Sequence, residues 1–305
     1  MKKGIPVFSN FIMAHYSIKD LEKLTGIKAH TLRIWEKRYN LLEPKRTNTN
    51  IRFYDDEDLK RILNIALLNR NGIKISRIAG LDENEICDKI SDLSKNYPDT
   101  ENIIDNLVMS MIDLDEKKFS KILVRSTEER GFEDTILHLI YPFFEKIGIL
   151  WQTGVVNPAQ EHFVSNLVRQ KLIASIDKLS ENEQQDAQRY IMFLPEGELH
   201  EINLLFYQYL ARKRGKKVVY LGQSVPFSNL ETVVQIKPCD SFITAFSSTF
   251  NGIDINSYLQ RLSESFPNQS IYFSSFNFEN MSRHFPENVT RINNAFHFTE
   301  IIDNM

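Results

Sequence analysis

The 305-residue sequence predicts an α/β multidomain protein with a winged helix-turn-helix head, a four-helix bundle and a flavodoxin-like, Rossmann-type open parallel sheet. Three observations support this prediction. Short amphipathic helices with a glycine turn and a polar hairpin come first, at 16–81. Longer amphipathic segments follow at 101–180, and short apolar strands alternating with helical segments fill 188–305. We expect residues 1–15 to form an N-terminal tail and 82–100 a polar linker.

Composition places the chain among ordinary soluble proteins, with 42% hydrophobic and 25% charged residues. No apolar run approaches the roughly 20 residues that a membrane helix needs, so we expect no membrane partner. The N-terminal stretch lacks the small-residue cleavage site of a signal peptide. Cys87 and Cys239 are too few and too far apart for a disulfide scaffold. These features predict a cytoplasmic protein.

The formal net charge of −3 hides an uneven distribution. Residues 1–80 carry 16 Lys and Arg against 8 Asp and Glu, whereas the rest carries 37 − 16 = 21 basic and 40 − 8 = 32 acidic residues. A basic first quarter on an acidic body is typical of a nucleic-acid-binding head on a sensor or oligomerisation region. The same charge distribution also fits an ordinary protein surface with unevenly spread charges. The residue pattern is therefore needed to choose between that and a nucleic-acid-binding head.

The head begins with a pattern of two short helices. The segment SIKDLEKLTG at 17–26 predicts a helix capped by Ser17, and Gly26 supplies the turn that follows. A second helix is expected over 30–39, HTLRIWEKRY, with Trp35 on its apolar side as a core anchor. Two short helices joined by a glycine turn can seat the second one in a major groove.

A hairpin and a third helix complete the head. The stretch LLEPKRTNTNIRFY at 41–54 is polar between apolar ends, which predicts a wing, and a helix is expected to open at Asp56 and end at Gly72. Cations on such a surface suit phosphate contacts, although Lys37 fits a solvated surface charge equally well. The cations of the second helix and the wing are Arg33, Lys37, Arg38, Lys45, Arg46 and Arg52.

The run from Tyr16 to about Leu81 resembles the DNA-binding domain of MerR-type regulators. Lys28 departs from that pattern, because the family has a Ser or Thr there that caps the second helix, and its loss costs about 1 kcal/mol. The resemblance rests on Thr31-Leu32-Arg33-x-Trp35-Glu36-x-Arg38-Tyr39, followed by Leu42, Pro44, Arg46, Arg52, Tyr54 and Asp58-Leu59. The helix pattern and the resemblance together predict contacts with double-stranded promoter DNA from Thr31, Arg33, Lys37, Arg38, Tyr39, Arg46, Arg52 and Tyr54.

Two kinds of periodicity divide the C-terminal region. Apolar residues at helical spacing predict four helices, at 102–113, 116–129, 132–151 and 159–179. An open parallel sheet binds ligands at the carboxyl ends of its strands, near the point where the strand order reverses. The loop PEGELHEIN after the first expected strand places a histidine at that edge. Strands are expected at 190–194, 217–222, 241–246, 270–275 and 289–293.

The bundle and the sheet together resemble the cobalamin-binding region of light- or cobalamin-responsive regulators, a module that also serves cobalamin-dependent methyltransferases. One motif is Trp, nine residues and then Glu-His, and the other is Asp/Glu-x-His-x-x-Gly. The corresponding residues are Trp151, Glu161 and His162 in the bundle, and Glu198, His200 and Asn203 after the first strand.

This resemblance implies adenosylcobalamin or methylcobalamin as cofactor. His200 would be the lower axial ligand of the cobalt, as a neutral imidazole oriented by Glu198. Trp151 would cover the upper face of the corrin, with Glu161 and His162 near the upper ligand. His200 and Trp151 also fit ordinary loop and helix-end packing roles.

Three departures bear on that cofactor. Asn203 replaces the glycine that lets the backbone approach the nucleotide tail, and Ser274-Ser275 stands where the family has a Gly-Gly pair lining the slot for the tail. Gln152 follows Trp151, whereas the photoreceptors of this type carry a histidine there that ligates cobalt after illumination. A light response is therefore not expected.

The predicted function is sequence-specific DNA binding by a transcription regulator, a repressor rather than an enzyme. One head covers one half-site, so we expect a homo-oligomer, a dimer or tetramer held by the C-terminal region, because no heptad run follows the head. A regulator with a degenerate cobalamin site controlled by a partner protein stays open. A cobalamin-dependent methyltransferase-like protein is the remaining alternative, but it would need a substrate domain and would leave the head unexplained.

Overall fold

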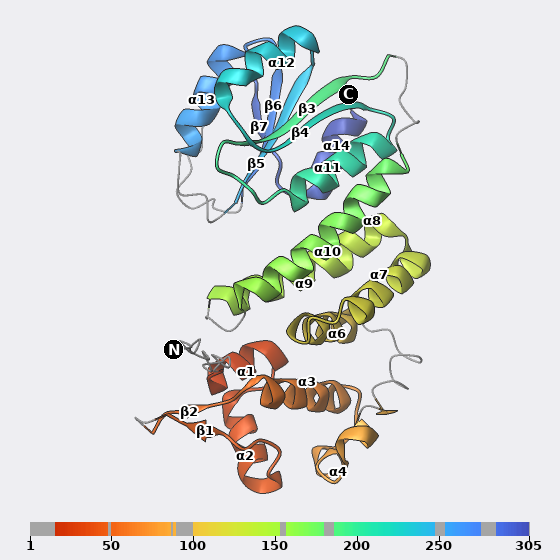
Figure 1. The fold of residues 1–305 in the computed structure, drawn as a ribbon, viewed down its shortest axis with the longest axis vertical. Coiled ribbons are helices and arrows are strands. Elements are labelled where there is room, and N and C mark those ends of the chain that lie inside the picture. Colours follow the sequence, from red (N-terminus) through yellow and green to blue (C-terminus); the bar gives the residue numbers. More distant parts are fainter. Residues whose placement is uncertain are drawn as a thin grey trace, which may run out of the picture. The chain divides into compact units, whose positions relative to one another are not determined.

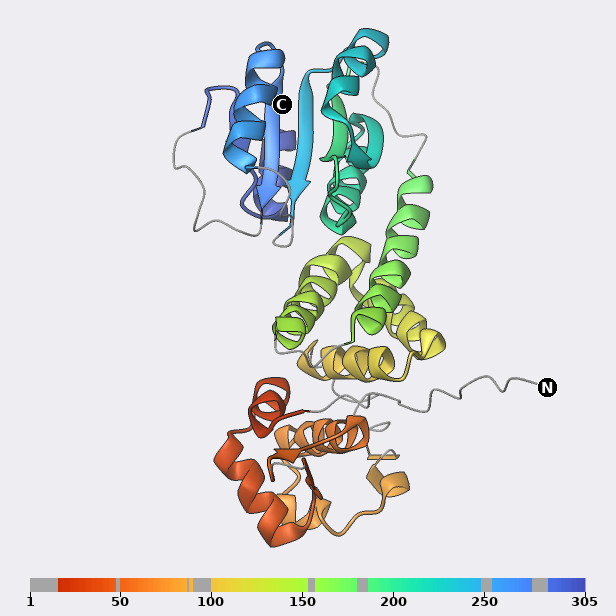
Figure 2. The ribbon, with the colours of Figure 1, turned by 60° about the vertical axis from the view of Figure 1, so that its left-hand side comes forward.

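The computed structural model describes the chain in eight stretches that divide between two compact units, residues 1–164 and 165–305 (Figures 1 and 2). The division falls inside helix α10, and the domain ranges given above stay predictions. The expected N-terminal tail and most of the linker lie outside the described residues. Within the described part of the chain, no helix has the length and apolar character that crossing a membrane requires. The described residues are 16–47, 50–86, 88–89, 100–152, 157–179, 186–247, 254–275 and 285–304.

The two expected helices of the head are confirmed as α1, Ile18–Thr25, and α2, Ala29–Tyr39. Ser17 caps α1 through a reciprocal pair of hydrogen bonds, in which its hydroxyl accepts from the Asp20 N–H and the Asp20 carboxylate accepts from the Ser17 N–H. Gly26 then takes a φ of 72°, a left-handed conformation that suits glycine and turns the chain into α2.

The cap missing at Lys28 is supplied from the preceding helix. Lys28 makes no side-chain cap for α2, but a carboxylate oxygen of Glu22 accepts a hydrogen bond from the Ala29 N–H at 3.0 Å. Glu22 also pairs with the Lys28 ammonium at 3.2 Å, and the Ala29 hydrogen bond together with Lys28 lowers the pKa of Glu22. The departure at Lys28 therefore leaves the start of α2 with a substitute acceptor.

The wing is a short hairpin in which β1, Lys45–Arg46, pairs antiparallel with β2, Arg52–Phe53. A backbone bridge between Tyr16 and Tyr54 fixes its base. Two helices follow, α3 over Asp56–Arg70 and α4 over Ile75–Ile78. The head core is made of buried side chains from the helices and the wing, including Leu21, Leu24, Leu32, Trp35, Tyr54, Leu59, Ile62 and Leu63.

The helices expected between 101 and 180 are confirmed, with one irregularity. The expected third helix is continuous in direction but contains a single π-helical segment, Ile136–Ile140, of the kind that bulges out one residue of an otherwise α-helical run. The elements are α6 (Thr100–Ile112), α7 (Glu116–Arg130), α8 (Phe132–Thr135), η1 (Ile136–Ile140), α9 (Tyr141–Gln152) and α10 (Pro158–Asp177).

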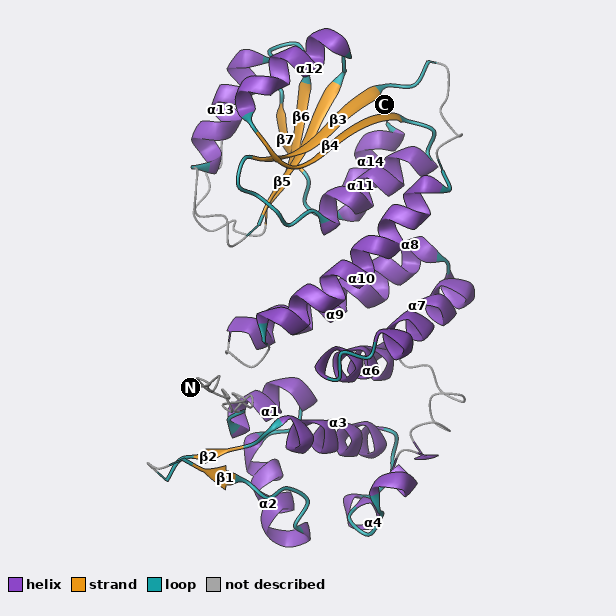
Figure 3. Ribbon diagram, in the orientation of Figure 1, coloured by secondary structure: helices purple, strands orange, loops and turns teal. Residues whose placement is uncertain are grey.

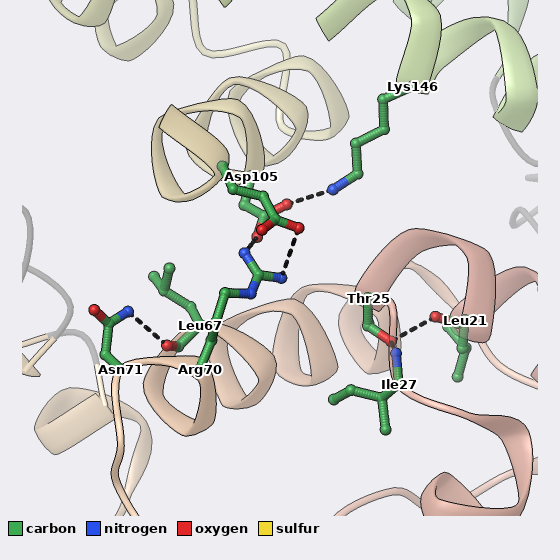
Figure 4. A network of polar contacts seen from close by, with 9 residues as sticks. Leu21, Thr25, Ile27, Leu67, Arg70, Asn71, Asp105 and Lys146 are labelled. Carbon is green, nitrogen blue, oxygen red and sulfur yellow. Dashed lines mark hydrogen bonds and ion pairs between the residues drawn. The ribbon is translucent and has the colours of Figure 1, made fainter. Parts of the chain in front are cut away.

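A buried carboxylate joins the head to the bundle within the first unit (Figure 4). Asp105 on α6 is 2% exposed and accepts from Arg70 of α3 at 3.3 Å and from Lys146 of α9 at 2.5 Å. A more exposed pair, Lys60 of α3 with Asp113 after α6, lies 2.5 Å apart. Two cations from different segments thus neutralise one carboxylate, as buried charge requires.

The second unit contains the predicted parallel sheet, and its strand order is β4-β3-β5-β6-β7 with all neighbours parallel. The order reverses between β3 and β5, as in flavodoxin-like sheets. The strands are β3 (Arg189–Pro195), β4 (Lys217–Val225), β5 (Ser241–Phe246), β6 (Ser270–Ser275) and β7 (Val289–Arg291).

Helices cover both faces of this sheet (Figure 3). On one face lie α11, Ile202–Lys213, and α14, Ala295–Asp303, which pack against each other. On the other lie α12, Leu230–Ile236, and α13, Ile255–Ser265, over a core that includes Phe242, Phe246 and Phe273. Since neighbouring side chains on a strand point to opposite faces, Ser274 points toward α11 and α14.

Candidate functional site

The second helix and the wing share a groove on the surface of the head. Arg33 and Lys37 line it from α2, and Arg52 lines it from β2. All three side chains are exposed. The structure therefore brings together three of the cations that the sequence predicts as DNA contacts, on the helix and the strand expected to carry them.

Two acidic residues, Glu36 and Glu43, also line the groove, and Glu36 organises it. Glu36 of α2 pairs with the Arg52 guanidinium at 3.6 Å and accepts a hydrogen bond from the Tyr54 hydroxyl at 3.0 Å. Tyr54 is 0% exposed, and burial, together with Glu36, raises its pKa, which keeps the phenol protonated as a donor. The Tyr54 ring is in the core, where it positions Glu36 and the wing, and its direct contact with DNA stays a prediction.

The other predicted DNA contacts fall into two groups. Arg38 and Arg46 are exposed; the Arg38 guanidinium lies 5.4 Å from the Tyr39 ring centroid, and Arg46 donates to the Asn50 side-chain oxygen at 2.8 Å across the wing. Thr31 and Tyr39 are half-buried. Trp35 is a core residue at 7% exposure, as its position on the apolar side of the helix predicts.

The loop after β3 presents one histidine at the carboxyl edge of the sheet. The side chain of His200 is 61% exposed, and its Nδ1 lies 2.8 Å from a carboxylate oxygen of Glu198. An ionised carboxylate only accepts, so Nδ1 carries the proton and Nε2 is the lone-pair nitrogen of the neutral ring. This is the arrangement in which a histidine acts as a metal ligand and a carboxylate sets its tautomer.

Glu198 is fixed at the point where the strand order reverses. Its side chain is 2% exposed and accepts from the Leu199 and His200 N–H groups, both at 2.9 Å, and from the Ser247 N–H at 2.7 Å. Ser247 follows β5, so the carboxylate ties the loop after β3 to the loop after β5. Burial raises the pKa of Glu198, but the hydrogen bonds from His200 and Ser247 outweigh it and bring the pKa to about 2. The carboxylate is therefore ionised at every physiological pH.

A second buried carboxylate follows directly in the chain and supports this loop. Glu201, 4% exposed, pairs with Arg169 of α10 and accepts from the Tyr220 hydroxyl of β4 at 2.7 Å. Sequence reasoning did not single out these three residues. An acidic residue just before an apolar helix, with a cation on another element, is too common a pattern to predict the pairing.

The remaining predicted cofactor residues lie in different places. Asn203 is half-buried in the first turn of α11, one turn after the loop that carries His200. Glu161 and His162 open α10 and pair at 3.1 Å within the first unit. Trp151 is in the last turn of α9, and its side chain, like that of Gln152, lies outside the described residues.

Two known protein families match consecutive segments of the chain. Residues 16–85 match the MerR HTH family regulatory proteins, and residues 103–174 match the B12 binding domain. The first match covers both helices and the wing around the cationic groove, and the second covers the helices from α6 into α10. The chain thus combines a segment that matches the MerR HTH family with one that matches the B12 binding domain.

Two transcriptional repressors are similar to this chain over most of its length. The chain is 26% identical to the HTH-type transcriptional repressor CarH of Myxococcus xanthus, over 83% of this chain and 85% of that protein. It is 25% identical to the repressor CarA of the same organism, over 72% and 73%. The regulator MlrA of Escherichia coli is 40% identical, but over only 25% of this chain and 31% of its own length.

A solved structure shares the fold of the C-terminal region. The monomethylamine corrinoid protein of Methanosarcina barkeri matches with a TM-score of 0.56 and 15% identity, over 68% of this chain and all of that protein. The match agrees with the helices followed by the five-stranded parallel sheet of this chain. The match of residues 103–174 to the B12 binding domain supports cobalamin as the cofactor.

The donor set at the sheet edge fits a corrinoid at one point. An imidazole with a lone-pair nitrogen and a fixed tautomer is a donor that cobalt accepts, and His200 with Glu198 supplies it. The first turn of α11 carries the Asn203 side chain where the motif has a glycine, so the approach to the nucleotide tail differs from the motif.

Proposed function

We propose that this MerR-type regulator is a repressor that binds promoter DNA in the cytoplasm as a homo-oligomer, and that cobalamin binding in its C-terminal region controls it. The observation that supports DNA binding most directly is the groove in which Arg33 and Lys37 of α2 face Arg52 of the wing. Phosphates are contacted by such cations, and base edges by side chains at the exposed face of a recognition helix.

The internal contacts of the groove favour this role over that of a solvated surface. Glu36 accepts from Tyr54 and pairs with Arg52, so the wing is held against α2 before any ligand arrives. A preformed surface loses less conformational entropy when it binds. Repression is supported by the similarity to CarH and CarA, both of which are transcriptional repressors.

For the C-terminal region, we propose that His200 supplies the axial nitrogen to cobalamin and that Glu198 orients it. When bound, cobalamin supplies a cobalt with an axial position that an imidazole can occupy. We propose regulation rather than catalysis, because residues 16–85 match a family of DNA-binding regulators and similar proteins over most of the chain are repressors.

The test of DNA binding is the affinity of the full chain for duplex fragments from upstream of its own gene. Arg33→Ala is expected to weaken binding by about 10-fold or more, the range for losing one base-contacting arginine. Wild-type affinity should fall steeply with salt, since phosphate contacts release counterions. Arg125→Ala is the matched control, because Arg125 is an exposed arginine of α7 that pairs with Glu129 outside the head. An Arg33→Ala variant that binds as tightly as the control would rule out docking through α2.

A further inference from the structure

The layer between α11 and the sheet is filled by the protein's own aromatic side chains. Tyr207 of α11 is 4% exposed, and its ring centroid lies 4.6 Å from that of Phe298 of α14, which is fully buried. Ser274, near the end of β6, points into the same layer, and its Oγ is buried without a hydrogen-bond partner among the described residues. Both helices of this face and the strand thus contribute a side chain to the layer.

This layer lies beneath α11, the helix that follows His200 in the chain. His200 lies two residues before the start of α11, and Asn203 and Tyr207 are four residues apart on that helix, so they lie on the same side, one turn from each other. Asn203 and Ser274, two of the positions that depart from the cobalamin motif, therefore lie on α11 and β6, the helix and the strand that border the Tyr207–Phe298 pair.

Cobalamin has a structural requirement at this point. Its nucleotide tail carries a base that occupies the lower position of the cobalt in the free cofactor. A histidine that takes this position displaces the base, and the tail then needs either room inside the protein or a place in solvent. Protein interiors are packed to crystal density, so a ring pair already in the layer leaves no room for a second aromatic group without repacking.

We propose, on the basis of the proposed cobalamin function, that this protein binds a corrinoid by its ring and leaves the nucleotide tail outside, because the Tyr207–Phe298 pair occupies the layer that a tail would enter. The ligand class is therefore broader than cobalamin. Corrinoids with a different lower base, or with no nucleotide at all, bind as well. Cobinamide, which has no lower base to displace, binds at least as tightly as cobalamin.

The experiment compares aquocobalamin with diaquocobinamide, each titrated into the full chain and followed by the visible spectrum. Wild type is expected to bind cobinamide as tightly as cobalamin or more tightly. Tyr207→Ala opens the layer and is expected to shift the ratio of the two dissociation constants by about 10-fold in favour of cobalamin, equivalent to about 1.4 kcal/mol. Tyr209→Ala is the matched control, because Tyr209 is buried on the same helix but stacks on Phe206. Tyr207→Leu serves as a milder change if the alanine variant unfolds.

The outcomes separate this inference from the function on which it rests. A wild-type preference for cobalamin of about 10-fold or more would overturn the inference while leaving the cobalamin site standing. An unchanged ratio in a folded Tyr207→Ala variant would overturn it too. His200→Ala is expected to lose affinity for both corrinoids, and a wild-type chain that retains neither would remove the proposed cofactor and the inference together.

Discussion

Two buried carboxylates, one in each unit, are held in opposite ways. Asp105 joins the head to the bundle and is matched by two full positive charges, Arg70 and Lys146, from different segments of the chain. Glu198, at the carboxyl edge of the sheet, is held by backbone N–H groups of the loops after β3 and β5 and by one imidazole. Both carboxylates are buried to nearly the same degree.

The difference indicates what each carboxylate does. A charge neutralised by two cations connects distant segments, and removing it leaves the cations unpaired, so its role is structural. A charge satisfied mainly by amides lowers its own pKa and sets the tautomer of a neighbouring histidine that is still 61% exposed. The first arrangement joins two helical layers, and the second orients a ligand.

Removing the Asp105 carboxylate is expected to have the largest effect on stability. Asp105→Ala should lower the free energy of unfolding of the first unit by about 3–5 kcal/mol, because Arg70 and Lys146 are left partly buried without their shared partner. Urea unfolding of the full chain measures it. Asp113→Ala removes a carboxylate that is 39% exposed and pairs with Lys60, so it should cost at most about 1 kcal/mol. Equal losses would refute the distinction between a buried junction and a surface pair.

The second carboxylate predicts a pH dependence. Because the pKa of Glu198 in the folded protein is about 2, below its ordinary value of 4.5, the stability that it contributes is complete above about pH 4.5 and is lost as the pH falls toward 2. Glu198→Gln should therefore lower the free energy of unfolding of the second unit by about 3 kcal/mol at pH 7, a difference that narrows in acid. Urea unfolding at pH 7 and pH 3 measures this. Glu196→Gln, at an exposed position in the same loop, is the control. If the difference in unfolding free energy between wild type and Glu198→Gln is the same at both pH values, the low pKa of Glu198 is contradicted.

The smallest change in stability is expected when a third carboxylate, Glu36 of the head, loses its hydrogen-bond donor. Glu36 accepts from the neutral Tyr54 hydroxyl and pairs with the exposed Arg52. Tyr54→Phe removes one hydrogen bond to this carboxylate and should lower the free energy of unfolding by about 1.5–2 kcal/mol. DNA affinity should fall much less than in Arg33→Ala, because Tyr54 is buried and acts through Glu36. A loss of affinity as large as that of Arg33→Ala would instead indicate that the ring reaches the duplex.

Elements whose pattern is local were predictable from the sequence. The cap of α1 at Ser17, the turn at Gly26 and the start of α3 next to Asp56 depend on residues within a few positions of one another. The five strands follow from short apolar runs, and the parallel sheet follows from their alternation with helices. The pairing of Glu198 with His200 was also predictable, since a single residue separates them in one motif.

Contacts between distant residues could not be predicted in this way. Glu22 replaces the missing cap at Lys28, Arg169 finds Glu201, and Tyr207 meets Phe298, at separations of 7, 32 and 91 residues. The family resemblance implies a DNA contact for Tyr54, but a strand alternates its faces and the bridge to Tyr16 turns this residue inward, so that it packs the wing.

The sequence by itself determined the order of the three regions, the elements within them and the residue types brought to each surface, because helical and strand periodicities and helix caps are short-range properties. Only the tertiary structure decided which charges are buried, which aromatic side chains fill the layer beside His200 and which cations face one groove. These outcomes depend on packing at close density between segments far apart in the chain, and no pattern in one segment specifies its partner.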